Sequence, residues 1–157
     1  MTEERMKRKL LMSLGIAVIG IAFSGLAMAQ DSVVKVESQH SFDQTVSQVK
    51  SATSQNGLMV MGHLDQGKML SMTGLQLKGE SFLVGNPNMG KKLFTADPTV
   101  GVFVPIRIFV YEGSDGHTYV SYEKPSVALG QLNNPQVSMM AKMLDMKIQG
   151  IAQAATH

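Results

Sequence analysis

The chain has 157 residues, with 14 Lys and Arg against 12 Asp and Glu, and it contains no cysteine. Four of the basic and two of the acidic side chains lie in the first 29 residues, so the remainder is formally neutral, with 14 − 4 = 10 basic and 12 − 2 = 10 acidic groups. This neutrality argues against nucleic-acid binding through a basic face, and the lack of cysteine excludes a disulfide framework and thiol chemistry.

The first 29 residues have the layout of a secretory signal peptide. A basic stretch at 5–9 precedes an uncharged apolar run at 10–26 and the small-residue cleavage pattern AMA at 27–29. We expect cleavage there, leaving a single domain at 30–157 that is periplasmic or secreted and meets a membrane only through the uncleaved leader. An anchor that is kept is the alternative, because the apolar run lies at the lower limit for spanning a bilayer.

Two strands, a helix and a helical turn are predicted in the first half of the remaining chain. Residues 32–38 alternate as a strand does. Ser41 and Gln44 form a capping box that starts a helix, and Asn56-Gly57 ends it with a left-handed C-cap. The elements predicted next are a strand at 57–64, a short helical turn at 65–73 and a third strand at 81–85.

The stretch GNPNMGKK, which follows the third strand, contains most of the P-loop pattern G-x-x-x-x-G-K-[ST]. Lys92 stands where that pattern needs a hydroxyl group for Mg²⁺, so we exclude a nucleotide site. We predict instead that Asn86 caps a short helix whose first residue is a proline. The free N–H groups at the start of that helix, helped by Lys91 and Lys92, would form a weak anion-binding site.

The second half of the chain predicts two more strands and a helix. Residues 101–112 form the strongest strand, and 117–123 returns antiparallel to it after a turn. Asn134-Pro135 begins a last helix that runs to about Ala155. The order β-α-β(4)-α predicts an α+β fold in which helices pack on one face of an antiparallel β-sheet, leaving the second face for function.

That outward sheet face is the main candidate site. Alternation along 101–112 places Phe103, Arg107, Phe109 and Tyr111 on it, and Tyr119 joins them from the return strand. Such a face is too apolar to be left in water. We expect a homodimer interface or cover from another part of the chain, with the alternative of a small-molecule pocket in which Arg107 binds an acidic group. The predicted core row of the same strand is Val102, Val104, Ile106, Ile108 and Val110.

A soft-metal site is an alternative function. Met59, Met61 and His63 are predicted on the outward face of strand 57–64, and two thioethers with an imidazole suit Cu(I). The inward residues of that strand are predicted to be Leu58, Val60 and Leu64. The sequence contains no catalytic motif, so we expect a binding module that needs no cofactor.

The stretch from Gly74 to Glu123 resembles domain of unknown function family 302. The matching features are a glycine-led strand at 74–77, the turn Gly85-Asn86-Pro87, the helix start at 90–94, Asp97-Pro98, the P-x-R strand at 104–112 and the return strand at 120–122. The resemblance implies a β-α-β(4)-α fold, often seen as a homodimer, with no agreed reaction. Many relatives carry Asp-His where this chain has Asp65-Gln66, so any role of that histidine does not transfer.

Overall fold

The computed structural model describes residues 32–157 of the chain. The signal peptide predicted at 1–29 lies outside these residues. Within 32–157, no helix combines the length and the apolar character needed to cross a membrane.

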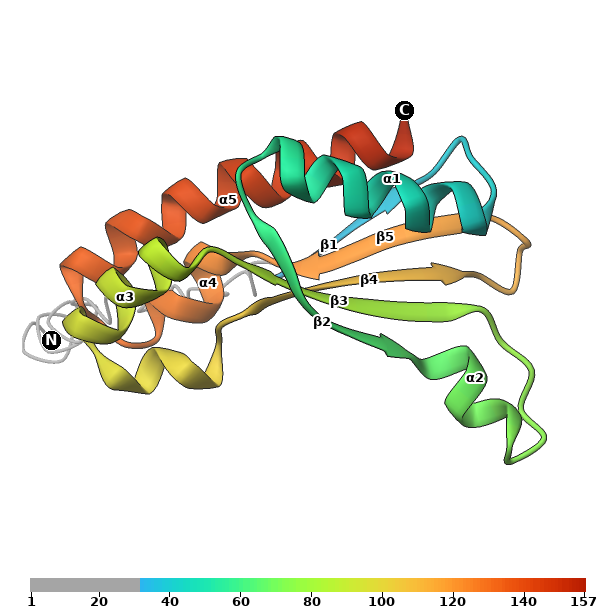
Figure 1. Cartoon of the computed structure of the whole chain (residues 1–157), viewed down its shortest axis with the longest axis horizontal. Helices are drawn as coiled ribbons and strands as arrows, with labels where there is room; N and C mark the ends of the chain where they lie inside the picture. Colours follow the sequence, from blue (N-terminus) through green and yellow to red (C-terminus); the bar gives the residue numbers. More distant parts are fainter. Residues whose placement is uncertain (1–31) are drawn as a thin grey trace, which may run out of the picture. The chain divides into compact units, whose positions relative to one another are not determined.

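A five-stranded antiparallel sheet forms one layer of the fold, with its strands in the order β1-β5-β4-β3-β2. The two longest helices, α1 (Phe42–Gln55) and α5 (Pro135–Thr156), lie side by side over one face of this sheet (Figure 1). The prediction of an α+β fold with an antiparallel sheet is confirmed. The strands are β1 (Val33–Glu37), β2 (Met59–Asp65), β3 (Gly79–Gly85), β4 (Ile106–Glu112) and β5 (Thr118–Glu123).

Two clusters of apolar side chains hold these layers together. The larger lies between the sheet and helices α1 and α5, where Phe82 and Ile108 are fully buried. The smaller lies around Leu93, where α5 packs with α3 (Pro87–Ala96) and α4 (Pro125–Gly130). Each fully buried side chain of this kind stabilises the fold by about 1.5–3 kcal/mol. The long helix α5 contributes to both clusters and therefore joins them.

The strand predicted at 101–112 begins only at Ile106. The preceding segment Pro98–Val102 forms a 3-10 helix, η1, which Asp97 caps by accepting a hydrogen bond from the N–H of Thr99. Val102, predicted in the core row, is consequently 83% exposed. The helix α4 has no counterpart in the sequence prediction. The core row that the structure keeps is Ile106, Ile108 and Val110.

The ends of α1 confirm the capping prediction. The Ser41 hydroxyl accepts a hydrogen bond from the N–H of Gln44 at 3.4 Å, and the Gln44 side-chain oxygen accepts one from the N–H of Ser41 at 3.3 Å. After the helix, Gly57 has φ of +69°, the left-handed conformation that glycine adopts without a steric cost. These local hydrogen bonds fix where the chain enters and leaves the layer of helices.

A β-bulge at Met61 interrupts the ladder between β2 and β3. Val60 pairs with Val84, but the next pair is Gly62 with Leu83, so Met61 is an extra residue with no partner of its own. One extra residue in a strand exchanges the faces of all residues beyond it, because side chains alternate with a period of two.

The bulge moves His63 to the side of the sheet on which the long helices lie. His63 pairs with the buried Phe82, and the two rings stack with their centroids 4.9 Å apart. Leu64 faces outward instead. The predictions that Met59, Met61 and His63 share one face, and that Leu64 points inward, are therefore wrong.

Candidate functional site

The outward face of the sheet carries an aromatic row. On β4, Arg107, Phe109 and Tyr111 alternate with the core residues, and the register places Tyr119 of β5 opposite Tyr111. The centroids of the Phe109 and Tyr111 rings lie 5.1 Å apart, and those of Tyr111 and Tyr119 lie 5.5 Å apart. These four residues share one face, as the alternation predicts. Phe103 lies outside β4, in the loop that follows η1.

Tyr119 is held in place by two neighbours. Its hydroxyl donates a hydrogen bond to Oδ2 of Asp115 over 2.6 Å, and Nζ of Lys35 lies 3.6 Å from the centroid of its ring. That hydrogen bond lowers the pKa of Asp115 and raises the pKa of Tyr119 to about 12. Only 8% of Tyr119 is exposed. This end of the face is thus a packed part of the structure with little room for a ligand.

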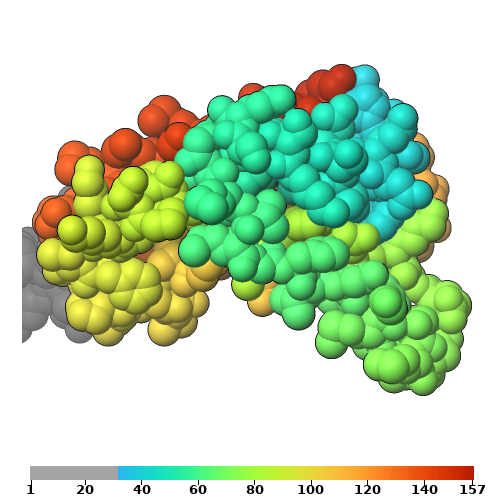
Figure 2. All heavy atoms as spheres, in the orientation of Figure 1, coloured from blue at the N-terminus to red at the C-terminus, as the bar shows by residue number. Residues whose placement is uncertain are grey.

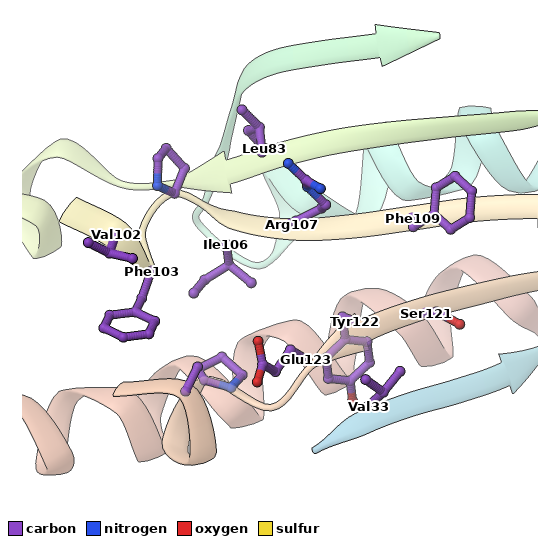
Figure 3. Close-up of a pocket in the computed structure, with 13 residues that line it drawn as sticks. Val33, Leu83, Val102, Phe103, Ile106, Arg107, Phe109, Ser121, Tyr122 and Glu123 are labelled. Atoms are coloured by element: carbon purple, nitrogen blue, oxygen red, sulfur yellow. The ribbon is translucent and has the colours of Figure 1, made fainter. Parts of the chain in front are cut away.

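A groove opens at the other end of the face, where β4 and β5 separate. The ladder between these strands starts at the pair Ile108–Tyr122, whereas β4 stays paired with β3 as far as Ile106 and β5 stays paired with β1 as far as Glu123. The gap between them is a cavity of about 380 Å³ (Figure 3). This volume lies near the lower limit of ligand pockets, which span about 300–1,000 Å³.

The groove takes its lining from segments that are distant in the sequence. Residues of β1, β3, β4 and β5 line it, and the loop after η1 and the helix α4 flank it. An apolar lining of this kind, with a few polar groups, is typical of small-molecule sites. Its main apolar side chains are Val33, Leu83, Phe103, Phe109, Pro125 and Ala128.

Two side chains of opposite charge line the groove, Arg107 of β4 and Glu123 at the end of β5. Figure 3 shows the guanidinium group of Arg107 on the side of Leu83 and the carboxylate group of Glu123 across the gap. Within residues 32–157, neither makes an ion pair. The planar guanidinium fork fits a carboxylate, to which it donates two parallel hydrogen bonds. No sequence pattern marks Glu123, since its position in the groove depends on where the ladder ends.

The residues predicted as an anion site lie away from the groove, at the start of α3. Asn86 caps this helix as predicted, and its side-chain oxygen accepts hydrogen bonds from the N–H groups of Asn88 at 2.9 Å and Met89 at 3.2 Å. Because those N–H groups are already bonded, the expectation that they are free for an anion is wrong. Lys91 and Lys92 border a shallow hollow on α3 and do not line the groove.

The structure does not bring the three predicted copper ligands together. Met59 and Met61 lie outward on β2, whereas Nε2 of His63 lies 2.7 Å from Oε2 of Glu80 on the other side of the sheet. Met61 also lines a second pocket of about 220 Å³ beneath α3, whose walls are nearly all apolar. In the described part of the chain, no three His, Cys, Asp or Glu side chains are grouped to hold a metal ion.

Residues 34–155 match the sequence pattern of the family described as domain of unknown function DUF302. The chain belongs to this family. A crystal structure of an uncharacterized conserved DUF302 protein from Bacillus stearothermophilus matches the fold with a TM-score of 0.75 and 19% sequence identity, covering 82% of this chain and 100% of that chain. The resemblance predicted from the sequence is confirmed, and at this identity the likeness to the Bacillus protein concerns the DUF302 fold.

The DUF302 chain is also similar to parts of two longer curated proteins. The fluoride-specific ion channel FluC 1 of Brucella suis biovar 1 is 28% identical over 101 residues, which are 64% of this chain and 40% of that protein. The protein of the same name from Brucella abortus biovar 1 is 28% identical over 101 residues, or 37% of its length. The match thus spans less than half of either relative, and their named activity is not transferred to this chain.

Proposed function

We propose that this DUF302 protein is an exported, non-catalytic binding module that holds a small acidic molecule in the groove between β4 and β5. The observation that carries the proposal is Arg107, a cation without an ion pair among residues 32–157, beside a mainly apolar cavity of about 380 Å³. The guanidinium group would bind the acid, and the apolar lining would cover the hydrocarbon part of the ligand.

Each part of the groove would make a different contribution. Apolar area removed from water at Leu83, Phe109 and Val33 supplies affinity, at about 25 cal/mol per Å². The bidentate contact at Arg107 supplies orientation and selects an acid over a neutral molecule of the same shape. A site of this kind binds and releases its ligand unchanged, which suits a carrier or a sensor.

Matched small ligands test this proposal. Protein made from the full-length sequence is titrated with 4-methylpentanoate and with the neutral 4-methylpentanamide, and binding is followed by NMR shifts of the backbone amides. The acid should bind about tenfold more tightly, the effect of about 1.4 kcal/mol. Arg107→Gln should remove this preference, whereas Lys91→Gln, which removes a cation outside the groove, should keep it. Equal affinity for acid and amide in the wild type would contradict the proposal.

Export rests on the leader pattern of residues 1–29. Expression of the full-length sequence in a bacterial host, followed by mass spectrometry of the purified product, should give a chain that begins at Gln30. A product that retains residues 1–29 would contradict cleavage, and recovery of the mature chain from the cytoplasm alone would contradict export.

Self-association is a second candidate function, favoured by the exposed apolar side chains of β2, α2 (Gln66–Ser71) and the loop after α2. β2 is an edge strand, and α2 with the loop after it projects beside that strand (Figures 1 and 2). Exposed apolar patches and unpaired strand edges mark interaction sites. The exposed apolar residues of β2, α2 and the following loop are Met59, Val60, Met61, Leu64, Met69, Leu70, Met72, Leu75 and Leu77.

Sedimentation velocity of the purified protein at micromolar concentration tests self-association. The wild type should sediment as a dimer. A double variant, Met72→Glu with Leu75→Glu, should be a monomer with an unchanged circular dichroism spectrum. Met146→Glu, which places the same charge at an exposed position of α5, should remain a dimer. A monomeric wild type would rule out this candidate without affecting ligand binding at Arg107.

The arrangement of β2 argues against copper binding through Met59, Met61 and His63. The bulge places His63 on the opposite side of β2 from the two methionines, so one ion cannot contact all three without a rearrangement of the strand. Titration of the purified protein with Cu(I) is the check. Binding weaker than micromolar, or binding that survives Met61→Leu combined with His63→Ala, rules this candidate out.

A further inference from the structure

Arg107 and Glu123 occupy facing positions on neighbouring strands but do not pair. Ile108 is opposite Tyr122 in the β4–β5 ladder, so the next step of the same register would bring Arg107 opposite Glu123. Opposite charges at such positions normally attract across a sheet. Here the ladder has ended, and no nitrogen of Arg107 lies within 4.0 Å of a Glu123 carboxylate oxygen.

The backbones that carry these two charges are each held by the strand on the other side. Arg107 is paired with Leu83, which keeps β4 with β3, and Glu123 is paired with Val33, which keeps β5 with β1. The two side chains therefore stand on opposite walls of one cavity (Figure 3).

A ligand with a single charge satisfies only one of the two charged side chains. An acid bound at Arg107 leaves Glu123 without an oppositely charged partner, and an amine bound at Glu123 leaves Arg107 without one. A ligand that carries both charges satisfies both walls and adds no net charge to the groove. Its hydrocarbon part would then rest on the apolar lining, as in the proposed function.

We infer that the groove binds a small zwitterion, a molecule that joins a carboxylate, an ammonium group and a short apolar part, which is the chemical class of the apolar free amino acids. The inference rests on the proposed function and adds a second binding residue to it. Arg107 receives the carboxylate of the ligand, and Glu123 receives its ammonium group. The volume of about 380 Å³ suits a molecule of that size.

Three probes that differ by one charged group each test this inference on protein made from the full-length sequence. L-leucine carries both charges, 4-methylpentanoate lacks the ammonium group, and 3-methylbutylamine lacks the carboxylate. In calorimetry and NMR titration, L-leucine should bind about tenfold more tightly than either of the other two probes.

Two variants test which side chain binds which charged group of the ligand. Glu123→Gln should weaken L-leucine about tenfold and leave 4-methylpentanoate unchanged or tighter, because a repulsive charge is removed. Arg107→Gln should weaken L-leucine and 4-methylpentanoate but spare 3-methylbutylamine. Asp43→Asn, which removes an exposed carboxylate on α1, should change none of the three affinities. Equal thermal midpoints for all variants show that the fold is intact.

The outcomes separate this inference from the proposed function. Two results would overturn the inference of zwitterion binding while leaving the proposed acid binding in place. One is 4-methylpentanoate binding through Arg107 as tightly as L-leucine, and the other is an unchanged affinity for L-leucine in Glu123→Gln. If neither acid binds the wild type, both proposals fail. Both proposals are supported if Glu123→Gln weakens only L-leucine while Arg107→Gln weakens L-leucine and 4-methylpentanoate.

Discussion

The amide side chain of Asn86 joins the start of α3 to the turn after α1, so its removal should lower the stability of the domain. Its oxygen accepts hydrogen bonds from Asn88 and Met89 at the start of α3, and its nitrogen donates one to the carbonyl oxygen of Gly57 at 3.1 Å. Loss of an N-cap costs about 0.5–2 kcal/mol, and loss of a further hydrogen bond costs about 0.5–1.5 kcal/mol. Asn86→Ala should therefore lower the free energy of unfolding by about 2 kcal/mol.

Urea unfolding followed by circular dichroism measures this loss, and the aspartate variant provides a matched control. Asn86→Asp keeps the capping oxygen and adds a favourable negative charge at a helix N-terminus, but it loses the donor to Gly57. It should cost about half as much as Asn86→Ala. The reasoning is refuted if Asn86→Ala lies within about 0.5 kcal/mol of the wild type, or if Asn86→Asp is as unstable as Asn86→Ala.

Three further predictions concern backbone contacts and pH. Gly67→Ala in α2 should destabilise the fold, because the added Cβ would lie 2.6 Å from the carbonyl oxygen of Leu77. Gly90→Ala in α3 should stabilise the fold by about 1 kcal/mol, because a Cβ there would have nothing within 4 Å. Midpoints of thermal unfolding that shift in the same direction for both variants would contradict this. Folding lowers the pKa of Asp115. The ionised Asp115 therefore stabilises the fold at pH values above its pKa in the unfolded chain, and this stabilisation is lost as the pH falls through its pKa in the folded protein. The difference in free energy of unfolding between the wild type and Asp115→Asn should therefore shrink as the pH is lowered. In an ultraviolet titration, Tyr119→Phe should remove the phenolate that forms at about pH 12.

Features that depend on a few neighbouring residues were predictable from the sequence. The caps at Ser41 and Asn86 each need only a side-chain oxygen and the N–H groups two or three residues later, and both form as predicted. The start of β4 was misplaced because Asp97-Pro98, which ends α3, also caps η1. An N-cap followed by a proline is a helix-start signal, and here it overrides the alternation of the residues that follow.

The faces of β2 could not be read from alternation alone, because the bulge is set by its partner strand. One signal was present, since an isolated glycine within a strand suggests a bulge. A Cβ on Gly62 would lie 3.2 Å from Cδ1 of Leu83, which shows how closely the two strands approach at this point. The groove gave no signal at all, because it depends on three ladders that end at different residues.

The position of α5 after all five strands has a consequence for when the domain can fold. Its first half supplies Val137 and Leu144 to the smaller apolar cluster, and its second half supplies Ile148 and Ile151 to the larger one. Neither apolar cluster can close until α5 has been synthesised, so the strands and the other helices stay incompletely packed until then. For a protein exported as proposed, late closure of the core would leave the domain unfolded while its leader is recognised.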